Sequence, residues 1–283
     1  MHLLKKIHHK YLVWRMLRKK RSIFGNQIHK IEGVGKKSID FDKKMKKPSI
    51  SVIVLSHNNK NIIFDCIDSL LKFNDYSYEI IVVDNKSSDG SAKLLQKKYK
   101  NKIKLILNEV NGCASGRNLG AMASNSEYLI FIDSDQGADS HGWMDNFIRI
   151  FNNFSNIGAI GWHGGFFTEP NLTGPSFSHY KDNALPNKYL FRTNVDYLET
   201  GGLMIKKTFL NKLNGFDTIY DPYTFADADL SRKVVEVKKK LVYCPSLNIY
   251  HRAHSTTKAD MNRKEYSNQF SKNAIYFRKK WIE

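Results

Sequence analysis

Between Ser49 and Ile132, short continuous apolar runs alternate with segments whose apolar residues recur at helical spacing. The runs are SISVIVLS, YEIIVVD, KIKLIL and YLIFI, and their length and β-branched content predict strands, of which SISVIVLS, YEIIVVD and YLIFI are expected to be buried. Helical periodicity lies between them, in NKNIIFDCIDSLLKF, SAKLLQKKY and ASGRNLGAMAS. This alternation predicts parallel βαβ units with right-handed crossovers. We therefore expect an α/β fold with a Rossmann-like, mainly parallel sheet flanked by helices.

Polar residues follow the predicted strands directly, and acids stand at two of the strand ends. The residues concerned are Ser56, His57 and Asn58, then Asp84 and Asn85, and finally Asp133, Ser134 and Asp135. Turns alone favour Asn, Asp and Ser, but ligands of parallel sheets bind beyond the carboxyl ends of the strands. For the last two acids a helix cap, a buried ion pair and a bound cation all remain open, because an unpaired buried charge is costly.

The net charge of +18 is concentrated in one part of the chain. Residues 1–47 hold 15 Lys or Arg and 3 Asp or Glu, a net of +12, and Pro48 marks the predicted boundary with a domain at 48–283. Within this predicted leader, residues 22–47 show no clear periodicity and are predicted to be a linker. The leader begins with a helix that carries Leu3, Ile7, Tyr11 and Trp14 on one face. Such a basic amphipathic helix at residues 1–21 fits an anionic membrane surface or packs on its own domain. Nucleic acid is disfavoured, because no nucleic-acid motif accompanies the charge.

Cysteine usage and the absence of long apolar runs indicate a cytoplasmic location, either free or peripheral at the inner face of a membrane. The three cysteines, Cys66, Cys113 and Cys244, are widely spaced and form no zinc signature, which favours a reducing compartment. No apolar run in the sequence approaches the roughly 18 residues of a membrane span. The basic N-terminus also lacks the apolar core and cleavage site of a signal peptide.

Five segments together resemble family 2 glycosyltransferases of the GT-A fold, in particular the rhamnosyltransferase-like members. They are SVIVLSHNN, YEIIVVDNKSSDGS, NGCASGRNLGAMAS, YLIFIDSDQ and FADADLSRKV, and they occur in the family's order and spacing. The resemblance extends from Ser49 to Trp281. It implies a nucleotide-binding half at 48–140 and an acceptor half with a C-terminal helix at 141–283.

The resemblance also implies roles for individual residues. Those implied to bind the donor nucleotide are Ser56, Asn58, Asp84, Asn85, Arg117, Asn118 and Ser134, with Asp84 accepting a hydrogen bond from the imide of uracil or thymine. Those implied to hold Mn2+ or Mg2+ are Asp133, Asp135 and His251. Asp227 would be the general base, and its neighbour Asp229 either supports it or exchanges roles with it.

One position departs from the family pattern. Ala226 stands where a glutamate usually precedes the base, so we expect Glu199 to supply a carboxylate to the acceptor site from another strand. Gly201 and Gly202, which follow it, indicate a close backbone approach on the acceptor side, and Asp229 is a further candidate there. The Gln-x-x-Arg-Trp motif of processive synthases is absent from the sequence, which predicts the addition of one sugar per encounter.

The sequence thus predicts a metal-dependent, inverting hexosyltransferase. It would move one sugar from a UDP- or dTDP-sugar to a hydroxyl of a glycan, lipid-linked or protein acceptor in surface glycan or glycoconjugate assembly. A hard cation stabilises the charge of a leaving diphosphate, and a carboxylate accepts the proton of the attacking hydroxyl. A sugar-nucleotide nucleotidyltransferase is the alternative, although its glycine-rich first loop is missing. A non-catalytic basic binding module leaves the acids at the strand ends unexplained.

Overall fold

The computed structural model describes residues 21–26, 48–172, 174, 176–178, 191–245, 248–252 and 263–283. The strands of the first half are β1 (Ile50–Ser56), β2 (Glu79–Asp84), β3 (Lys104–Leu107), β4 (Tyr128–Asp133) and β5 (Gln136–Ala138). Those of the second half are β6 (Ile157–Gly161), β7 (His163–Gly165), β8 (Ser176–Ser178), β9 (Tyr197–Leu198), β10 (Leu203–Lys206), β11 (Lys240–Tyr243) and β12 (Ile249–His251). The α-helices are α2 (Ile63–Lys72), α3 (Ser91–Tyr99), α4 (Cys113–Ala123), α5 (Asp145–Asn153), α6 (Lys207–Lys212), α7 (Ala226–Glu236) and α9 (Arg263–Trp281), and the 3-10 turns are η1 (Lys100–Lys102) and η2 (Thr218–Tyr220).

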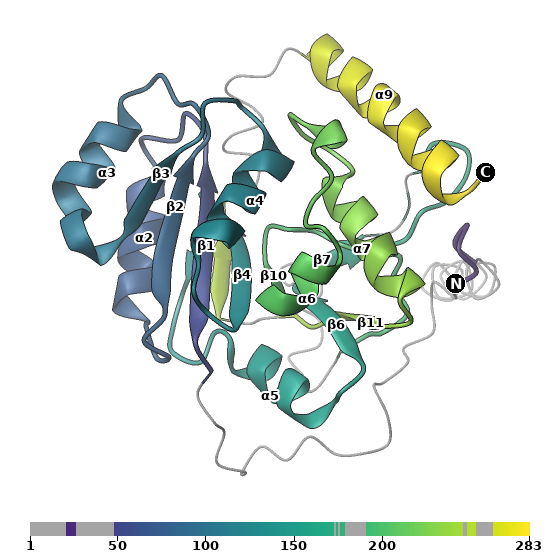
Figure 1. Ribbon diagram of the computed structural model, residues 1–283, viewed down its shortest axis with the longest axis horizontal. Helices are drawn as coiled ribbons and strands as arrows, with labels where there is room; N and C mark the ends of the chain where they lie inside the picture. The colour runs from purple at the N-terminus through teal and green to yellow at the C-terminus, as the bar shows by residue number, and fades with distance from the viewer. Residues whose placement is uncertain are drawn as a thin grey trace, which may run out of the picture.

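A seven-stranded sheet in the order β11-β6-β10-β4-β1-β2-β3 forms the centre of the molecule (Figure 1). Strands β1 to β4 pair in parallel, which confirms the predicted βαβ units. Strand β10 runs antiparallel between β4 and β6. The α/β fold with a mainly parallel sheet is therefore confirmed, and one antiparallel strand joins its two halves.

Helices cover both faces of the sheet, which explains why the central strands are apolar on both sides. All seven residues of β1 are buried. Its residues Val52 and Val54 pack with α2 and α5, and Ile53 and Leu55 pack with α4 and α7. Helix α9 adds Phe277, which is fully buried, to this second layer.

Two small sheets lie beyond the central sheet and bring distant segments together. Strand β12 pairs antiparallel with β5, which follows β4 in the chain, so that His251 lies opposite Gln136. The second sheet has the order β8-β7-β9, and β7 begins at His163. These pairings bring residues of the C-terminal part next to the acidic end of β4.

Residues 21–26 are packed on the domain, although the sequence predicted a linker from residue 22 onward. The Ser22 Oγ and Asn26 Nδ2 atoms both donate to Asp196 Oδ1, at 2.9 and 2.6 Å. The Phe24 ring contacts Phe277, with centroids 6.4 Å apart. The linker prediction is therefore wrong for 22–26, because these side chains bury against a carboxylate and an aromatic cluster. The rest of the leader lies outside the described residues, and the boundary at Pro48 remains a prediction.

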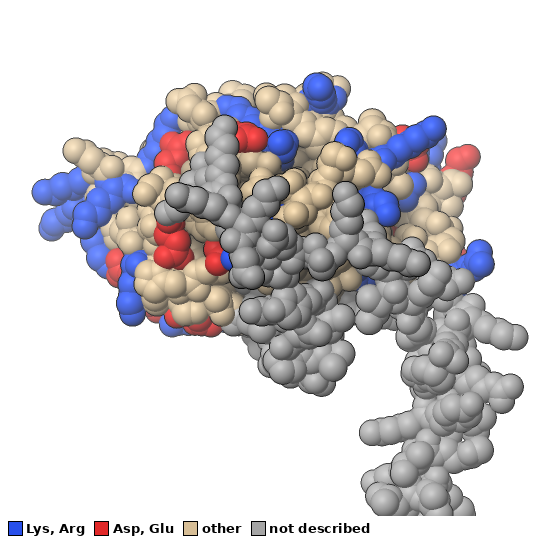
Figure 2. Space-filling model, turned by 90° about the horizontal axis from the view of Figure 1, so that it is seen from below, with Lys and Arg blue, Asp and Glu red and all other residues tan. Residues whose placement is uncertain are grey.

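The charged surface of the domain is mixed in sign. On the face seen in Figure 2, Lys and Arg side chains are interspersed with Asp and Glu. Among the described helices, none is long and apolar enough to cross a membrane.

Candidate active site

The register of the parallel strands aligns three polar residues at one edge of the sheet. Ser56 pairs with Asp84, and Asp133 pairs with Leu55, the residue before Ser56. Asp84 is 3% exposed, and its Oδ1 accepts a hydrogen bond from Ser87 N at 2.9 Å. Within the described part of the chain, the buried Asp84 Oδ2 and Ser56 Oγ atoms have no hydrogen-bond partner. A buried polar atom without a partner is costly, so this edge is suited to a ligand that donates hydrogen bonds.

Amide side chains hold the turns around this edge in place. Asn58 has a left-handed backbone, with φ of 48°, and its Oδ1 accepts from Ser88 N at 2.8 Å. Asn85 Oδ1 accepts from Asn108 Nδ2 at 2.7 Å. Ser134 Oγ accepts from an asparagine amide, Asn59 Nδ2, at 2.6 Å. Three predicted donor-binding residues, Asn58, Asn85 and Ser134, thus line up along the strand ends and stabilise the loops there.

Arg117 and Asp133 form an ion pair at the end of β4, with Arg117 Nη2 3.0 Å from Asp133 Oδ1. Helix α4 reaches this position because Gly120 lies directly over β1, where a Cβ atom would be 2.4 Å from Ile53. Burial raises the pKa of Asp133, while the charge of Arg117 opposes that rise. The Nε atom of Arg117 is buried without a hydrogen-bond partner among the described residues.

Asp135 lies beside His251, as the predicted metal site requires. Asp135 Oδ1 is 3.4 Å from His251 Nε2, and Asp135 O accepts from Arg252 N at 2.8 Å, which fixes β12 next to the turn. Burial lowers the pKa of His251, but the carboxylates of Asp135, Asp133 and Glu199 together outweigh it and the net shift is upward. Among all residues that the structure describes, no group of three or more His, Cys, Asp and Glu side chains could hold a metal by itself.

A cavity of about 170 Å³ joins the end of β4 to the start of α7. Its lining residues are Cys113, Arg117, Asp133, Glu199, Thr200, Gly201, Thr224, Ala226 and Asp227. Burial raises the pKa of Asp227, and the nearby Arg117 opposes this rise. Gly201 permits the turn between β9 and β10 to approach the end of β4, because a Cβ atom there would be 2.5 Å from Asp133 Oδ2. The cavity therefore brings carboxylates from three separate segments around one guanidinium.

Glu199 connects this cavity to the predicted metal ligands through His163. Glu199 Oε2 is 3.6 Å from His163 Nδ1, and the rings of His163 and His251 have centroids 5.3 Å apart. His163 is 2% exposed. A continuous row of polar side chains thus runs from the cavity to Asp135.

Comparison with known sequences decides the family. The sequence profile described as Glycosyl transferase family 2 matches residues 51–212, more than half of the chain. The chain belongs to glycosyltransferase family 2. Among curated family relatives, a putative glycosyltransferase, EpsH, of Bacillus subtilis is 34% identical over 93 residues, or 32% of this chain and 27% of that protein. The poly(ribitol-phosphate) β-N-acetylglucosaminyltransferase TarS of Staphylococcus aureus is 26% identical over 63% of this chain and 30% of its own length. The matches thus span about a third or less of these relatives.

Solved structures establish the GT-A fold. GalNAc-T7 with UDP, GalNAc and Mn2+ superimposes with a TM-score of 0.62 at 16% identity, over 74% of this chain and 44% of that one. A mannosyltransferase of Pyrobaculum calidifontis with GDP-Man and Mn2+ gives 0.56 at 19% identity, over 85% and 68% of the two chains. The family prediction and the fold class are confirmed, while the rhamnosyltransferase-like subtype remains a prediction.

The structure of this family 2 domain holds three predicted site residues in other surroundings. Asp229 is fully buried and accepts hydrogen bonds from Trp281 Nε1 at 2.8 Å and Tyr220 OH at 3.3 Å. Asn118 exchanges two hydrogen bonds with the backbone of Phe216, at 2.8 and 2.9 Å. Gly202 has φ of 111° and lies against Trp162. None of these three residues lines the cavity around Asp227.

The family 2 site also includes residues that we did not predict from the sequence. Cys113, Thr200 and Thr224 line the cavity, and His163 links Glu199 to His251. Cys113 opens the predicted helix ASGRN, and Thr200 follows Glu199, so proximity to predicted residues was the available signal for these two. No feature of the sequence marks Thr224 as a site residue. His163 could be assigned to the site only from the structure, where β7 pairs with β9 and brings it next to Glu199.

Proposed function

We propose that this chain is a metal-dependent, inverting glycosyltransferase that moves one sugar from a UDP- or dTDP-sugar to an acceptor hydroxyl. In this proposal residues 48–140 bind the nucleotide and residues 141–283 shape the acceptor side. One observation carries it, namely that a single cavity joins Asp227 at the start of α7 to Asp133 and Arg117 at the end of β4. A donor sugar in this cavity has a charge-neutralising group on one side and a proton acceptor on the other.

Asp84 is proposed to recognise the base. Its Oδ2 atom is buried and has no partner among the described residues, and the imide N–H of uracil or thymine is a donor that would satisfy it. Ser56 lies opposite Asp84 in the register of β1 and β2. Its hydroxyl would add a second polar contact to the base. Because Ser87 N already donates to Asp84 Oδ1, an amide in place of this carboxylate would have one acceptor oxygen for two donors, which explains the expected preference for a carboxylate.

The residues at the predicted metal site fit Mn2+ or Mg2+. Asp133, Asp135 and His251 offer two carboxylates and an imidazole, and Asp135 already contacts His251. Because the described residues supply no complete set of three close ligands, diphosphate oxygens would provide the remaining ones. A divalent cation there would stabilise the charge that accumulates on the leaving diphosphate. The Mn2+ in two solved structures of the same fold supports this assignment.

Asp227 is proposed to accept the proton of the attacking hydroxyl. Its burial raises its pKa above that of an ordinary carboxyl, and this makes it a stronger base. Glu199 lies in the same cavity and would orient the acceptor in place of the carboxylate that Ala226 lacks. Attack from the side opposite the diphosphate inverts the anomeric centre in one displacement.

The acceptor is proposed to be a surface glycan or a lipid-linked precursor. Relatives named for poly(ribitol-phosphate) and teichuronic acid support a polymer of the cell surface. The basic leader, with seven Lys or Arg and no Asp or Glu in residues 1–20, would hold the protein at the inner face of an anionic membrane. Free cytoplasmic protein acceptors are the less favoured alternative.

The test is the release of free nucleoside diphosphate from a panel of UDP-, dTDP- and GDP-sugars with Mn2+. We expect release from a uracil or thymine donor, its loss in chelator, and its loss in Asp135→Ala, which should still fold. Release of pyrophosphate from a sugar phosphate and a nucleoside triphosphate would instead identify a nucleotidyltransferase. Full activity of folded Asp135→Ala in excess chelator would refute the metal assignment.

A further inference from the structure

Helix α9 presents an exposed stripe of alternating cations and isoleucines. Lys272, Ile275 and Lys279 follow one another at steps of three and four residues, which places them on one side of the helix. Ile282 continues this spacing one residue beyond the end of the helix. All four are exposed, and Ile275 is 69% exposed. The helix holds six Lys or Arg and one Glu. An exposed face of this composition has the basic and apolar character of a membrane-surface helix.

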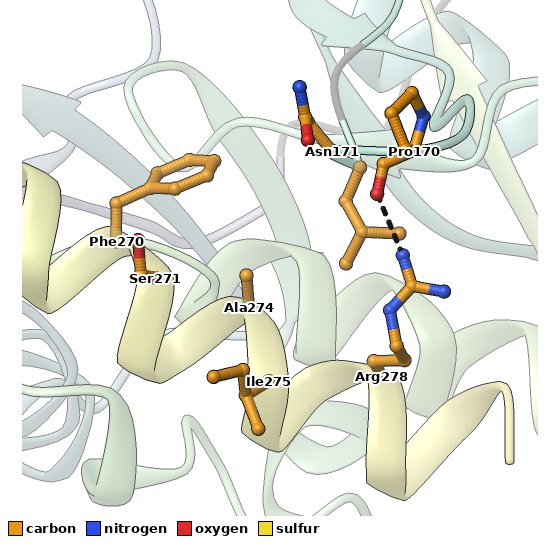
Figure 3. A pocket seen from close by; sticks show the side chains of 8 residues that line it. Pro170, Asn171, Phe270, Ser271, Ala274, Ile275 and Arg278 are labelled. Atoms are coloured by element: carbon orange, nitrogen blue, oxygen red, sulfur yellow. Dashed lines mark hydrogen bonds between the residues drawn. The ribbon is translucent and has the colours of Figure 1, made fainter.

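An apolar groove lies beside this stripe. It has a volume of about 440 Å³ between α9 and the turn at 170–172, and Figure 3 shows Phe270, Ala274 and Ile275 on its helix side. Leu172 completes its apolar lining. At one end Arg278 is held by Glu169 and by Pro170 O, at 2.9 and 3.0 Å. The groove is therefore a recess at the edge of a basic surface, in which apolar residues predominate and Asn171, Ser271 and Arg278 supply the polar part of the lining.

The described part of the leader packs on the same helix. Residues 21–26 place Phe24 against Phe277 of α9, with ring centroids 6.4 Å apart. Both the leader and α9 carry an excess of positive charge, and like charges disfavour the packing of one on the other. An anionic partner that contacts both segments would neutralise the positive charge of each.

We propose that the stripe on α9 and its groove are a second membrane contact, which binds an anionic lipid surface together with the leader. This inference rests on the proposed membrane association of the leader. The lysines contact lipid phosphates, and Ile275 and the groove take up apolar parts of the lipids. Exposed isoleucines favour lipid over a soluble polyanion, because a polyanion would leave them in water.

The contact would place the acceptor side of the cavity near the membrane. Asn273, which is buried on α9, donates to Tyr220 O and Tyr223 O at 2.9 and 2.8 Å and to Thr224 O at 3.2 Å. Thr224 lines the cavity that contains Asp227. Helix α9 would therefore connect the membrane contact on its exposed side to the loop that lines the cavity on its buried side.

The experiment is co-sedimentation of the full chain with vesicles of anionic or of neutral phospholipid. The test variant carries Lys272→Ser, Ile275→Ser and Lys279→Ser together. The matched control carries Lys93→Ser, Lys97→Ser and Met122→Ser, which remove two exposed lysines and one exposed apolar side chain from α3 and α4. We expect a loss of at least about 10-fold in binding to anionic vesicles for the test variant, and no change for the control.

Two further measurements separate the outcomes. A full-length leader variant, Ile7→Ser with Trp14→Ser, tests the leader alone, and wild-type binding by this variant would refute the leader proposal while the α9 result stands. Wild-type binding by the folded α9 variant would overturn the inference, whatever the leader variant does. Ile275→Ser alone should weaken binding to vesicles but leave binding to soluble dextran sulfate unchanged. An equal effect on both would identify a polyanion site and overturn the lipid assignment.

Discussion

Asp229→Ala should destabilise the protein rather than remove its catalytic base. The Asp229 carboxylate is fully buried and lies 2.7 Å from Lys280 Nζ and 2.8 Å from Trp281 Nε1. Breaking a buried ion pair costs about 3–5 kcal/mol. The lower end applies here, because Lys280 keeps a second carboxylate, Asp217, at 2.8 Å. A loss of about 3 kcal/mol lowers the melting temperature by roughly 6–12 °C, at about 2–4 °C per kcal/mol for a chain of this size.

The assay is thermal unfolding followed by circular dichroism, with turnover measured well below the transition. Asp227→Ala is the matched control, since it also removes a carboxylate from the first turn of α7, two positions before Asp229. We expect its melting temperature to change little, because burial of that carboxylate is itself unfavourable, as its raised pKa indicates. If Asp229→Ala melts within 2 °C of the wild type and loses turnover, the reasoning is refuted and Asp229 is the base.

Four more predictions concern the candidate active site. Asp227→Asn should lower kcat by about 10²-fold or more with donor binding retained, as stopped assays and calorimetry would show. Because burial raises the pKa of Asp227 and Arg117 opposes this, kcat/KM should fall as pH decreases through that raised pKa, and Arg117→Gln should move this fall to higher pH. Gly201→Ala should reduce turnover at least about 10-fold by displacing Asp133, and unchanged kinetics would contradict the close approach. His163→Leu should weaken Mn2+ binding by about 10-fold, measured by electron paramagnetic resonance with nucleoside diphosphate present, and His163→Gln should weaken it less.

The nucleotide-binding half was predictable because its strands are continuous apolar runs. Strands β1, β2 and β4 are buried on both sides, and a buried strand requires such a run. In the other half, β6 has the sequence IGAIG and β10 is inserted antiparallel between β4 and β6. A short run with two glycines is a weak strand signal, and hydrophobic pattern does not encode strand order. The order of the strands in the whole sheet therefore could not be predicted from the sequence.

The candidate site shows the same limit at the level of single residues. Asp227 and Asp229 are two positions apart, which places them about 200° apart around a helix. One must face the cavity and the other the core. The sequence does not tell which, because α7 is covered by α9, whose Trp281 contacts Asp229 from 52 residues away in the chain. Similarly, His163 and His251 belong to β7 and β12, which lie in two different small sheets. Their ring centroids lie 5.3 Å apart only because the fold brings these two sheets together.

Because the hexapeptide at 21–26 is packed on the domain, an insertion within it should affect stability more than an insertion elsewhere in the leader. Residues 27–47 connect the hexapeptide to the domain, and the entropic cost of a connection between two fixed points rises by only about 0.6 kcal/mol for each doubling of its length. An insertion there should be tolerated. One extra residue between Ser22 and Asn26 would separate two donors that share Asp196 Oδ1 and withdraw Phe24 from the guanidinium of Arg232, 3.9 Å away. Progressive shortening from the N-terminus should therefore reduce stability in a single step, when the hexapeptide is removed.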